Sequence, residues 1–211
     1  MPVVTKEQII AYLTRGIAAL FAIMLHEIAH GYAAHRLGDE TARDMGRLSL
    51  NPIRHVDWFG LLMLILVGFG WAKPVPIDMR YFQNPKRDMC LVALAGPGMN
   101  FALAFVTLII YALGAAAVPE FVADFLIAFA LINVGLGVFN LFPIPPLDGS
   151  KAIGILIPDH IYYKILQYER YGMMALMLLL FTGVLNGPLS FLRGQILDGM
   201  WWVALKVTGN G

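Results

Sequence analysis

The sequence predicts an all-α polytopic membrane protein with about five to six transmembrane helices. Hydrophobic residues make up 59% of the 211 residues, and the mean hydropathy is +0.70. Charged residues make up only 14%, whereas soluble domains contain about 25%. Long apolar runs alternate with short polar segments, and a bilayer-spanning helix needs about 20 apolar residues. We therefore expect one membrane-embedded domain over residues 1–211.

Five apolar segments are candidates for membrane-spanning helices. The first is followed by Gly38, a residue that commonly ends helices. The fourth is shorter than a typical span. The fifth contains Arg193 and Asp198 and could either cross the bilayer or lie in its interface. The five segments are residues 6–37, 89–118, 121–142, 171–185 and 191–207.

The region after the first segment is expected to differ from a simple span. Residues 58–71 are apolar, but they cover only about half of the required length and contain glycines near their end. Such a piece suits a re-entrant or interfacial segment. Residues 72–79 contain Pro74 and Pro76, which exclude a central strand but permit an edge strand. The sequence therefore predicts a short re-entrant and edge-strand region here.

The distribution of basic residues predicts the orientation in the membrane. Eight Lys and Arg residues lie from Arg36 to Arg87, whereas the turn at Pro119 and Glu120 has none. Cytoplasmic loops are enriched in Lys and Arg. We therefore expect a multi-pass protein of the cell membrane in which the first and third spans both run toward the cytoplasmic side.

Residues 26–30 place two histidines and a glutamate inside the first apolar segment. His26 and His30 are four residues apart and share one face of a helix, so both imidazoles can reach one metal ion. Glu27 borders that face and could act as a general base, as in zinc hydrolases. A histidine in an apolar helix can also be a hydrogen-bonded core residue. Three ionisable groups within five membrane residues favour the metal site, since such groups are costly there.

A catalytic zinc ion usually has three protein ligands and one open position. His55 lies beside the re-entrant segment and is one candidate for the third ligand. Asp148 is a better one, because it follows an apolar span at a break that Pro143, Pro145 and Pro146 impose. An ordinary turn is the competing interpretation of Leu147, Asp148 and Gly149. The residues alone leave the choice open.

The paired motifs resemble the site-2 protease family of intramembrane zinc metalloproteases. The motif at residues 26–30 and the later one at 140–149 are the most specific, and residues 51–52, 70–76 and 95–100 support the likeness. The resemblance covers the chain to about Ile153. The chain has no PDZ insertion between the motifs, and we expect a minimal form that also lacks a nucleotide-binding regulatory domain.

The resemblance implies the roles of five residues and the identity of the cofactor. One Zn²⁺ per chain would be bound by His26, His30 and Asp148, with Glu27 as the base. Asn140 would contact the substrate or the transition state. The implied substrates are single-span membrane proteins embedded in the lipid bilayer, and the active site would face the cytoplasmic side.

Two other functions fit parts of the pattern. A membrane metal-ion transporter or binding protein would also place His and Asp in the membrane, but it has no evident need for Glu27 beside the ligands. A catalytically silent membrane scaffold would not require these four residues. The net charge of +1 gives no indication of a nucleic-acid partner, and nothing in the sequence indicates an oligomeric state.

Overall fold

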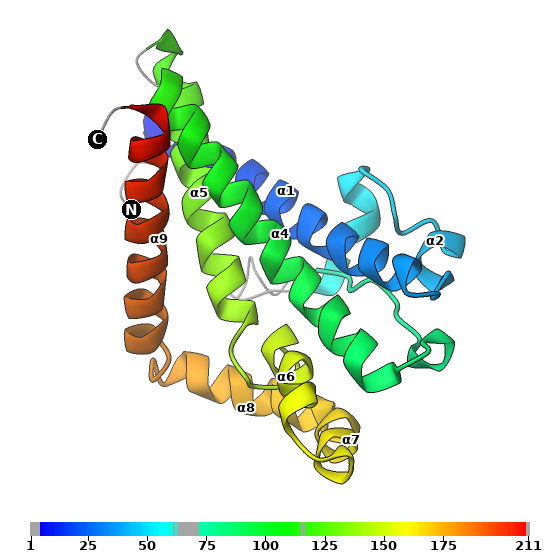
Figure 1. The fold of residues 1–211 in the computed structure, drawn as a ribbon. Coiled ribbons are helices and arrows are strands. Elements are labelled where there is room, and N and C mark those ends of the chain that lie inside the picture. Colours follow the sequence, from blue (N-terminus) through cyan, green and yellow to red (C-terminus); the bar gives the residue numbers. More distant parts are fainter. Residues whose placement is uncertain (1–4, 61, 63–71, 115–116, 210–211) are drawn as a thin grey trace.

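The computed structural model describes residues 5–60, 62, 72–114 and 117–209. All regular secondary structure within these residues is helical (Figure 1), which confirms the predicted all-α class. The long helices are α1 (Lys6–Arg36), α4 (Pro85–Gly114), α5 (Glu120–Asn140) and α9 (Asn186–Thr208). The shorter elements are α2 (Thr41–Asp44), η1 (Pro52–His55), η2 (Met79–Tyr81), α6 (Asp148–Ala152), η4 (Ile153–Leu156), α7 (Asp159–Gln167) and α8 (Glu169–Phe181).

Helix α1 begins and ends where its sequence predicts. Thr5 and Gln8 form a capping box, in which the Thr5 hydroxyl accepts from the Gln8 amide and the Gln8 side chain accepts from the Thr5 amide. At the other end, Gly38 has φ +106°, a conformation that favours glycine. The intervening 31 residues place His26 and His30 in the C-terminal part of the helix.

Helix α4 lies at the centre of the arrangement and packs against α1, α5, α6 and α9. Its contact with α5 and α9 is an apolar core around Ala104, Val134 and Val138. Small residues allow the helices to approach closely, which is how helices associate in bilayers. At Gly137 the two helices approach closely, because a Cβ atom there would lie 2.7 Å from the Phe101 ring.

The predicted five to six spans are not confirmed. Among the described residues, three helices (α1, α4 and α5) have the length and hydropathy to cross a membrane, and α8 with α9 could form a fourth, broken span. Helix α8 has 13 residues, about 20 Å, so it cannot cross a hydrocarbon core of about 30 Å alone. It meets α9 at an angle of 86°, and the turn between them contains Gly183 with φ +71°. Residues 171–185 and 191–207 are therefore not two independent spans.

The expected edge strand is not present in residues 72–78, where the structure has no regular secondary structure. The backbone of these residues forms most of its hydrogen bonds with side chains. Arg47 donates to the carbonyl oxygens of Lys73 and Pro74, at 2.6 and 3.3 Å, and buried Asp39 accepts from the Asp78 amide at 2.7 Å. A strand needs a backbone partner, and among the described residues only the Lys73 amide of this segment has one, the His55 carbonyl oxygen. The predicted re-entrant piece at 58–71 lies largely outside the described residues.

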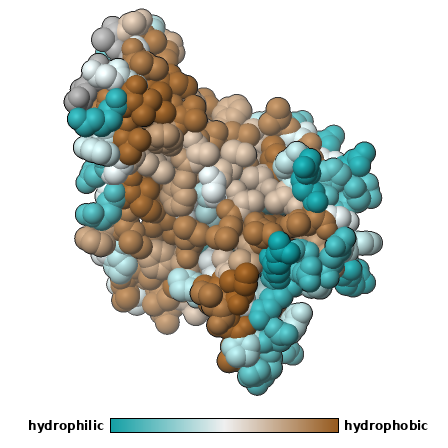
Figure 2. Space-filling model, viewed as in Figure 1, coloured by the Kyte–Doolittle hydropathy of each residue, from teal (hydrophilic) through white to brown (hydrophobic). Residues whose placement is uncertain are grey.

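Hydrophilic and apolar residues are separated on the surface. Figure 2 shows most hydrophilic residues near α2 and α7, a smaller number along the edge where α9 lies, and a broad, mainly apolar surface between them. Large apolar side chains on the long helices are exposed, such as Leu13, Leu113 and Phe121. Such a surface suits contact with lipid rather than water. This surface is consistent with the ability of α1, α4 and α5 to span a membrane.

We predict that Gly137→Ala lowers the thermal unfolding temperature, since the added methyl group would press into the Phe101 ring. Overpacking of this kind typically costs about 1–3 kcal/mol. Gly135→Ala is the matched control, because its nearest neighbour is the Arg193 side chain at 4.0 Å. Thermal unfolding of both variants in detergent measures the difference. Equal unfolding temperatures would contradict tight packing between α4 and α5.

Candidate metal centre and its cavity

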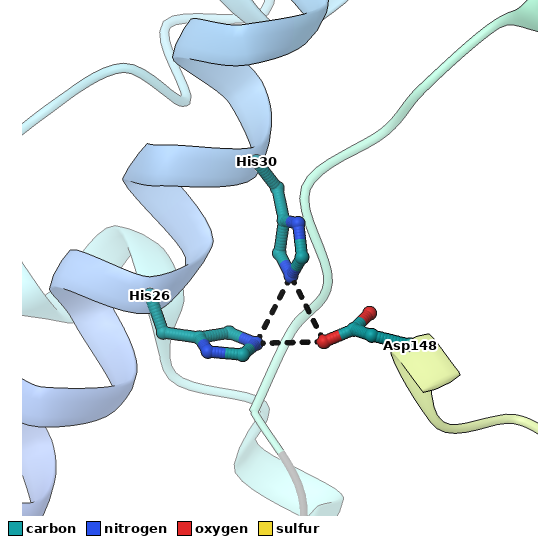
Figure 3. A group of neighbouring side chains, drawn as sticks. All are labelled: His26, His30 and Asp148. Atoms are coloured by element: carbon teal, nitrogen blue, oxygen red, sulfur yellow. Dashed lines mark hydrogen bonds and ion pairs between the residues drawn. The ribbon is translucent and has the colours of Figure 1, made fainter. Parts of the chain in front are cut away.

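His26, His30 and Asp148 meet at one point, although Asp148 is more than a hundred residues away in the chain. Figure 3 shows the three side chains converging from α1 and from the start of α6. The Nε2 atoms of the two histidines are 3.0 Å apart, and each lies 3.2 Å from Oδ2 of Asp148. Both histidines are buried, at 6% exposure. Among the described residues, these three form the one group of His, Cys, Asp or Glu side chains close enough together to hold a metal ion.

The other ring nitrogen of each histidine defines its tautomer. His30 Nδ1 lies 2.7 Å from the Val92 carbonyl oxygen, which can only accept, so Nδ1 carries the proton. His26 Nδ1 lies 2.6 Å from Oδ1 of Asn100 and donates in the same way. Both Nε2 atoms therefore present lone pairs, as metal-binding histidines do.

This arrangement fits a zinc ion. Two imidazole lone pairs and a carboxylate oxygen face one another at 3.0–3.2 Å, and without a cation between them they would repel. Ligand atoms at about 2.0–2.1 Å from a tetrahedral zinc are separated by about 3.3–3.4 Å, close to the observed triangle. Two nitrogens and one oxygen also form the donor set of catalytic zinc sites that keep a fourth position open.

Glu27 lies beside the three ligands and is held by the segment at residues 72–78. Its Oε2 accepts a hydrogen bond of 2.8 Å from the Val75 amide. Pro74 and Pro76 have no amide hydrogen, so Val75 supplies the single backbone donor within residues 74–76. This contact leaves Oε1 of Glu27 able to exchange a proton within the cavity.

The four residues line one cavity of about 360 Å³. Asn140, at the C-terminal end of α5, lines it too, and its Nδ2 donates to the Leu136 carbonyl oxygen at 3.0 Å. The structure thus brings together all five residues selected from the sequence. Most of the wall is apolar, from Ile23, Met89, Val92, Leu136, Phe139, Leu147, Met173 and Leu176.

The loop after α5 places Asp148. Leu147 is buried against Leu176 and Leu185, which anchors the start of α6 to the α8 region. Ser150 donates from Oγ to the Leu147 carbonyl oxygen at 2.7 Å. A Cβ atom on Gly149 would lie 2.2 Å from the Leu141 carbonyl oxygen, so only glycine fits behind Asp148. The competing interpretation of an ordinary turn does not account for this packing.

His55, the alternative third ligand, is used elsewhere. It is buried, and its Nε2 donates to the Ser49 carbonyl oxygen at 2.8 Å. His35 contacts Glu40 at 2.9 Å, and His160 is exposed on α7. None of the three joins His26 and His30, so the structure favours Asp148 as the third ligand.

Sequence reasoning missed the role of Gly96. A Cβ atom at this position on α4 would lie 2.3 Å from Nε2 of His30 and 2.6 Å from Cε1 of His26. The absent side chain creates the space that the two imidazoles occupy. The signal was the run of small residues at 95–98, which supported the family resemblance but was given no role at the metal site.

The chain is similar in sequence to one peptidase family and to relatives that carry zinc-metalloprotease names. A model of peptidase family M50 matches residues 16–119 and 109–183. The "Putative zinc metalloprotease YwhC" of Bacillus subtilis is 39% identical over 173 residues, which are 79% of each chain. The "Putative zinc metalloprotease Rip2" of Mycolicibacterium smegmatis is 32% identical over 79% of this chain and 66% of its own length. No solved structure gives a significant match.

The chain belongs to peptidase family M50, the site-2 protease family, as the motifs predicted. It is thereby a metalloprotease of a membrane-embedded family, and its helices α1, α4 and α5 have the length and hydropathy to span a bilayer.

We predict that Gly96→Ala sharply reduces zinc binding, because the methyl group would displace both imidazoles. Gly98→Ala is the matched control: it lies two residues along the same helix and has no atom within 4 Å of the added Cβ. Elemental analysis of both purified variants measures the difference. Full zinc content in the Gly96 variant would show that the histidine positions in this structure are not those of the metal site.

Proposed function

We propose that this protein is an intramembrane zinc endopeptidase that hydrolyses peptide bonds in membrane-spanning proteins. The observation that carries the proposal is the placement of Glu27 beside His26, His30 and Asp148 in one mainly apolar cavity. A metal transporter has no evident use for a base held at that position. Membership of a protease family supports the same conclusion.

Each residue has a defined task in this proposal. His26, His30 and Asp148 hold one zinc ion, which when bound lowers the pKa of a water molecule and polarises the scissile carbonyl. Glu27 takes the proton from the attacking water at Oε1 and later delivers it to the leaving amine. The Val75 amide keeps Oε2 occupied and orients the carboxylate. Asn140 contacts the substrate from the end of α5.

The proposed location is the cell membrane, with several spans and the cavity toward the cytoplasmic side. The C-terminal part of α1 and the end of α5 both contribute to the cavity. Eight Lys and Arg residues lie from Arg36 to Arg87, next to these helix ends, and such residues are enriched on the cytoplasmic side. The apolar surface of the long helices supports contact with lipid.

A substrate helix must unwind locally before its peptide bond can reach Glu27. We propose that residues 74–78 hold the unwound substrate by backbone pairing, as strand addition does elsewhere. Pro74, Val75 and Ile77 line the cavity, and the Ile77 amide has no hydrogen-bond partner among the described residues. Pairing there would place an extended chain next to the base.

We predict that Glu27→Gln retains zinc but abolishes cleavage. A glutamine oxygen can still accept from the Val75 amide, but it cannot take a proton, and loss of a general base costs about 10²–10⁴-fold in rate. The measurement combines zinc content with cleavage of a panel of single-span membrane proteins in detergent. Asp148→Ala, which should lose both zinc and cleavage, is the control. Near-full cleavage by the glutamine variant would rule out this mechanism.

We predict that a photo-crosslinker at position 77 captures substrate on the Glu27→Gln background. Tyr81 is the matched control position, because it lies on the same connection but does not line the cavity. Crosslinks from position 81 and none from position 77 would rule out binding along residues 74–78, while leaving the protease activity itself untouched.

A further inference from the structure

Two asparagines are completely buried among the long helices, outside the cavity. Asn100 lies on α4 and Asn133 lies on α5, and both have 0% exposure. Neither lines the cavity that holds Glu27. A buried amide within apolar helices costs free energy unless all of its hydrogen bonds are made, so their presence calls for an explanation.

The hydrogen bonds of the two amides run in one direction. Asn133 lies 2.8 Å from the Phe129 carbonyl oxygen, which can only accept, so the Asn133 group facing it is the NH₂. Its oxygen then points to α4 and accepts from Asn100 Nδ2, also at 2.8 Å. The oxygen of Asn100 is thereby turned toward His26 Nδ1, at 2.6 Å.

Reversal of the Asn100 amide would have a consequence at the metal centre. An NH₂ group facing Nδ1 of His26 can be accommodated only when Nδ1 is an acceptor. The proton of the neutral ring would then sit on Nε2, where it would block the lone pair directed at His30 and Asp148. Without Asn133, the side-chain amide of Asn100 could rotate so that its oxygen and NH₂ group change places. Its other hydrogen bond, to the Ala22 carbonyl oxygen, is long at 3.4 Å and would hold the amide only weakly.

We propose that Asn133 is a positioning residue for zinc binding: it fixes the amide of Asn100 and through it the Nδ1–H tautomer of His26. This role rests on the proposed zinc ligation by His26. The chain of contacts crosses three helices, from α5 through α4 to α1, so the packing of α5 against α4 directly affects a ligand on α1. Outer partners of ligating histidines typically contribute 10–100-fold to metal affinity.

The test is the zinc affinity of purified variants in detergent, measured by competition with a chelator. Asn133→Leu, which removes the acceptor for Asn100 Nδ2, should weaken zinc binding about 10–100-fold. Asn133→Asp in its protonated form can still accept from Asn100 and donate to Phe129, so its affinity should stay near that of the wild type. Thr107→Val is the control, because it removes a buried polar group from α4 that is not hydrogen-bonded to Asn100 or Asn133, and it should leave zinc affinity unchanged.

A double-variant cycle distinguishes this role from general packing. In Asn100→Asp both carboxyl oxygens can accept, so the His26 tautomer no longer depends on Asn133. Adding Asn133→Leu to that background should leave zinc affinity unchanged or raise it, because the Asn133 oxygen no longer faces a carboxylate. If the leucine variant does not fold, Asn133→Ser replaces it, since a serine hydroxyl can bond back to the Phe129 carbonyl but cannot reach Asn100.

The outcomes separate this inference from the proposed function. Wild-type affinity in Asn133→Leu, or an equal loss in the Asn100→Asp background, would overturn the role of Asn133 and leave the zinc site standing. A wild-type protein that binds no zinc would overturn the metal site and the role of Asn133 together. The proposal would be supported if Asn133→Leu weakened zinc binding only when Asn100 is present, and if Asn133→Asp kept the zinc affinity of the wild type.

Discussion

The site depends on the forced proximity of three lone-pair donors in a buried place. His26 Nε2, His30 Nε2 and Asp148 Oδ2 lie within 3.2 Å of one another, and both histidine protons are held on the opposite ring nitrogens. Such a group is unfavourable without a cation, because the repulsion is poorly screened away from water. The surrounding structure therefore has to hold the three ligands in place, and the observed packing does so.

The ligands are held in place both by glycines that leave room for them and by hydrogen bonds that orient them. Gly96 leaves room on α4 for both imidazoles, and Gly149 lets the loop behind Asp148 close against the backbone at Leu141. The Val92 carbonyl oxygen and the Asn100 side-chain oxygen accept hydrogen bonds from the Nδ1 atoms of His30 and His26 and so orient the rings, while the Val75 amide donates to Glu27 and orients it. The small residues along these helices thus contribute to chemistry as well as to helix packing.

The differences between expectation and structure follow from local interactions that composition does not reveal. Hydropathy marks residues 171–185 and 191–207 as apolar, but it cannot show that a turn at Gly183 bends α8 away from α9. The pattern at residues 72–79 permits an edge strand, yet the backbone there bonds mainly to the side chains of Arg47, Asp39 and Glu27. Those partners are distant in sequence, so the pattern could not identify them.

The sequence by itself determined the helical class and the family, and it selected His26, Glu27 and His30 as candidate site residues. It could do so because helical periodicity places His26 and His30 on one face, and because ionisable groups in apolar segments are rare. Only the tertiary structure decided that Asp148, not His55, completes the group, and that Gly96, Val75 and Asn133 matter to it. These depend on the approach of α1, α4, α5 and the α6 loop, and contacts between separate helices leave no periodic signal in the chain.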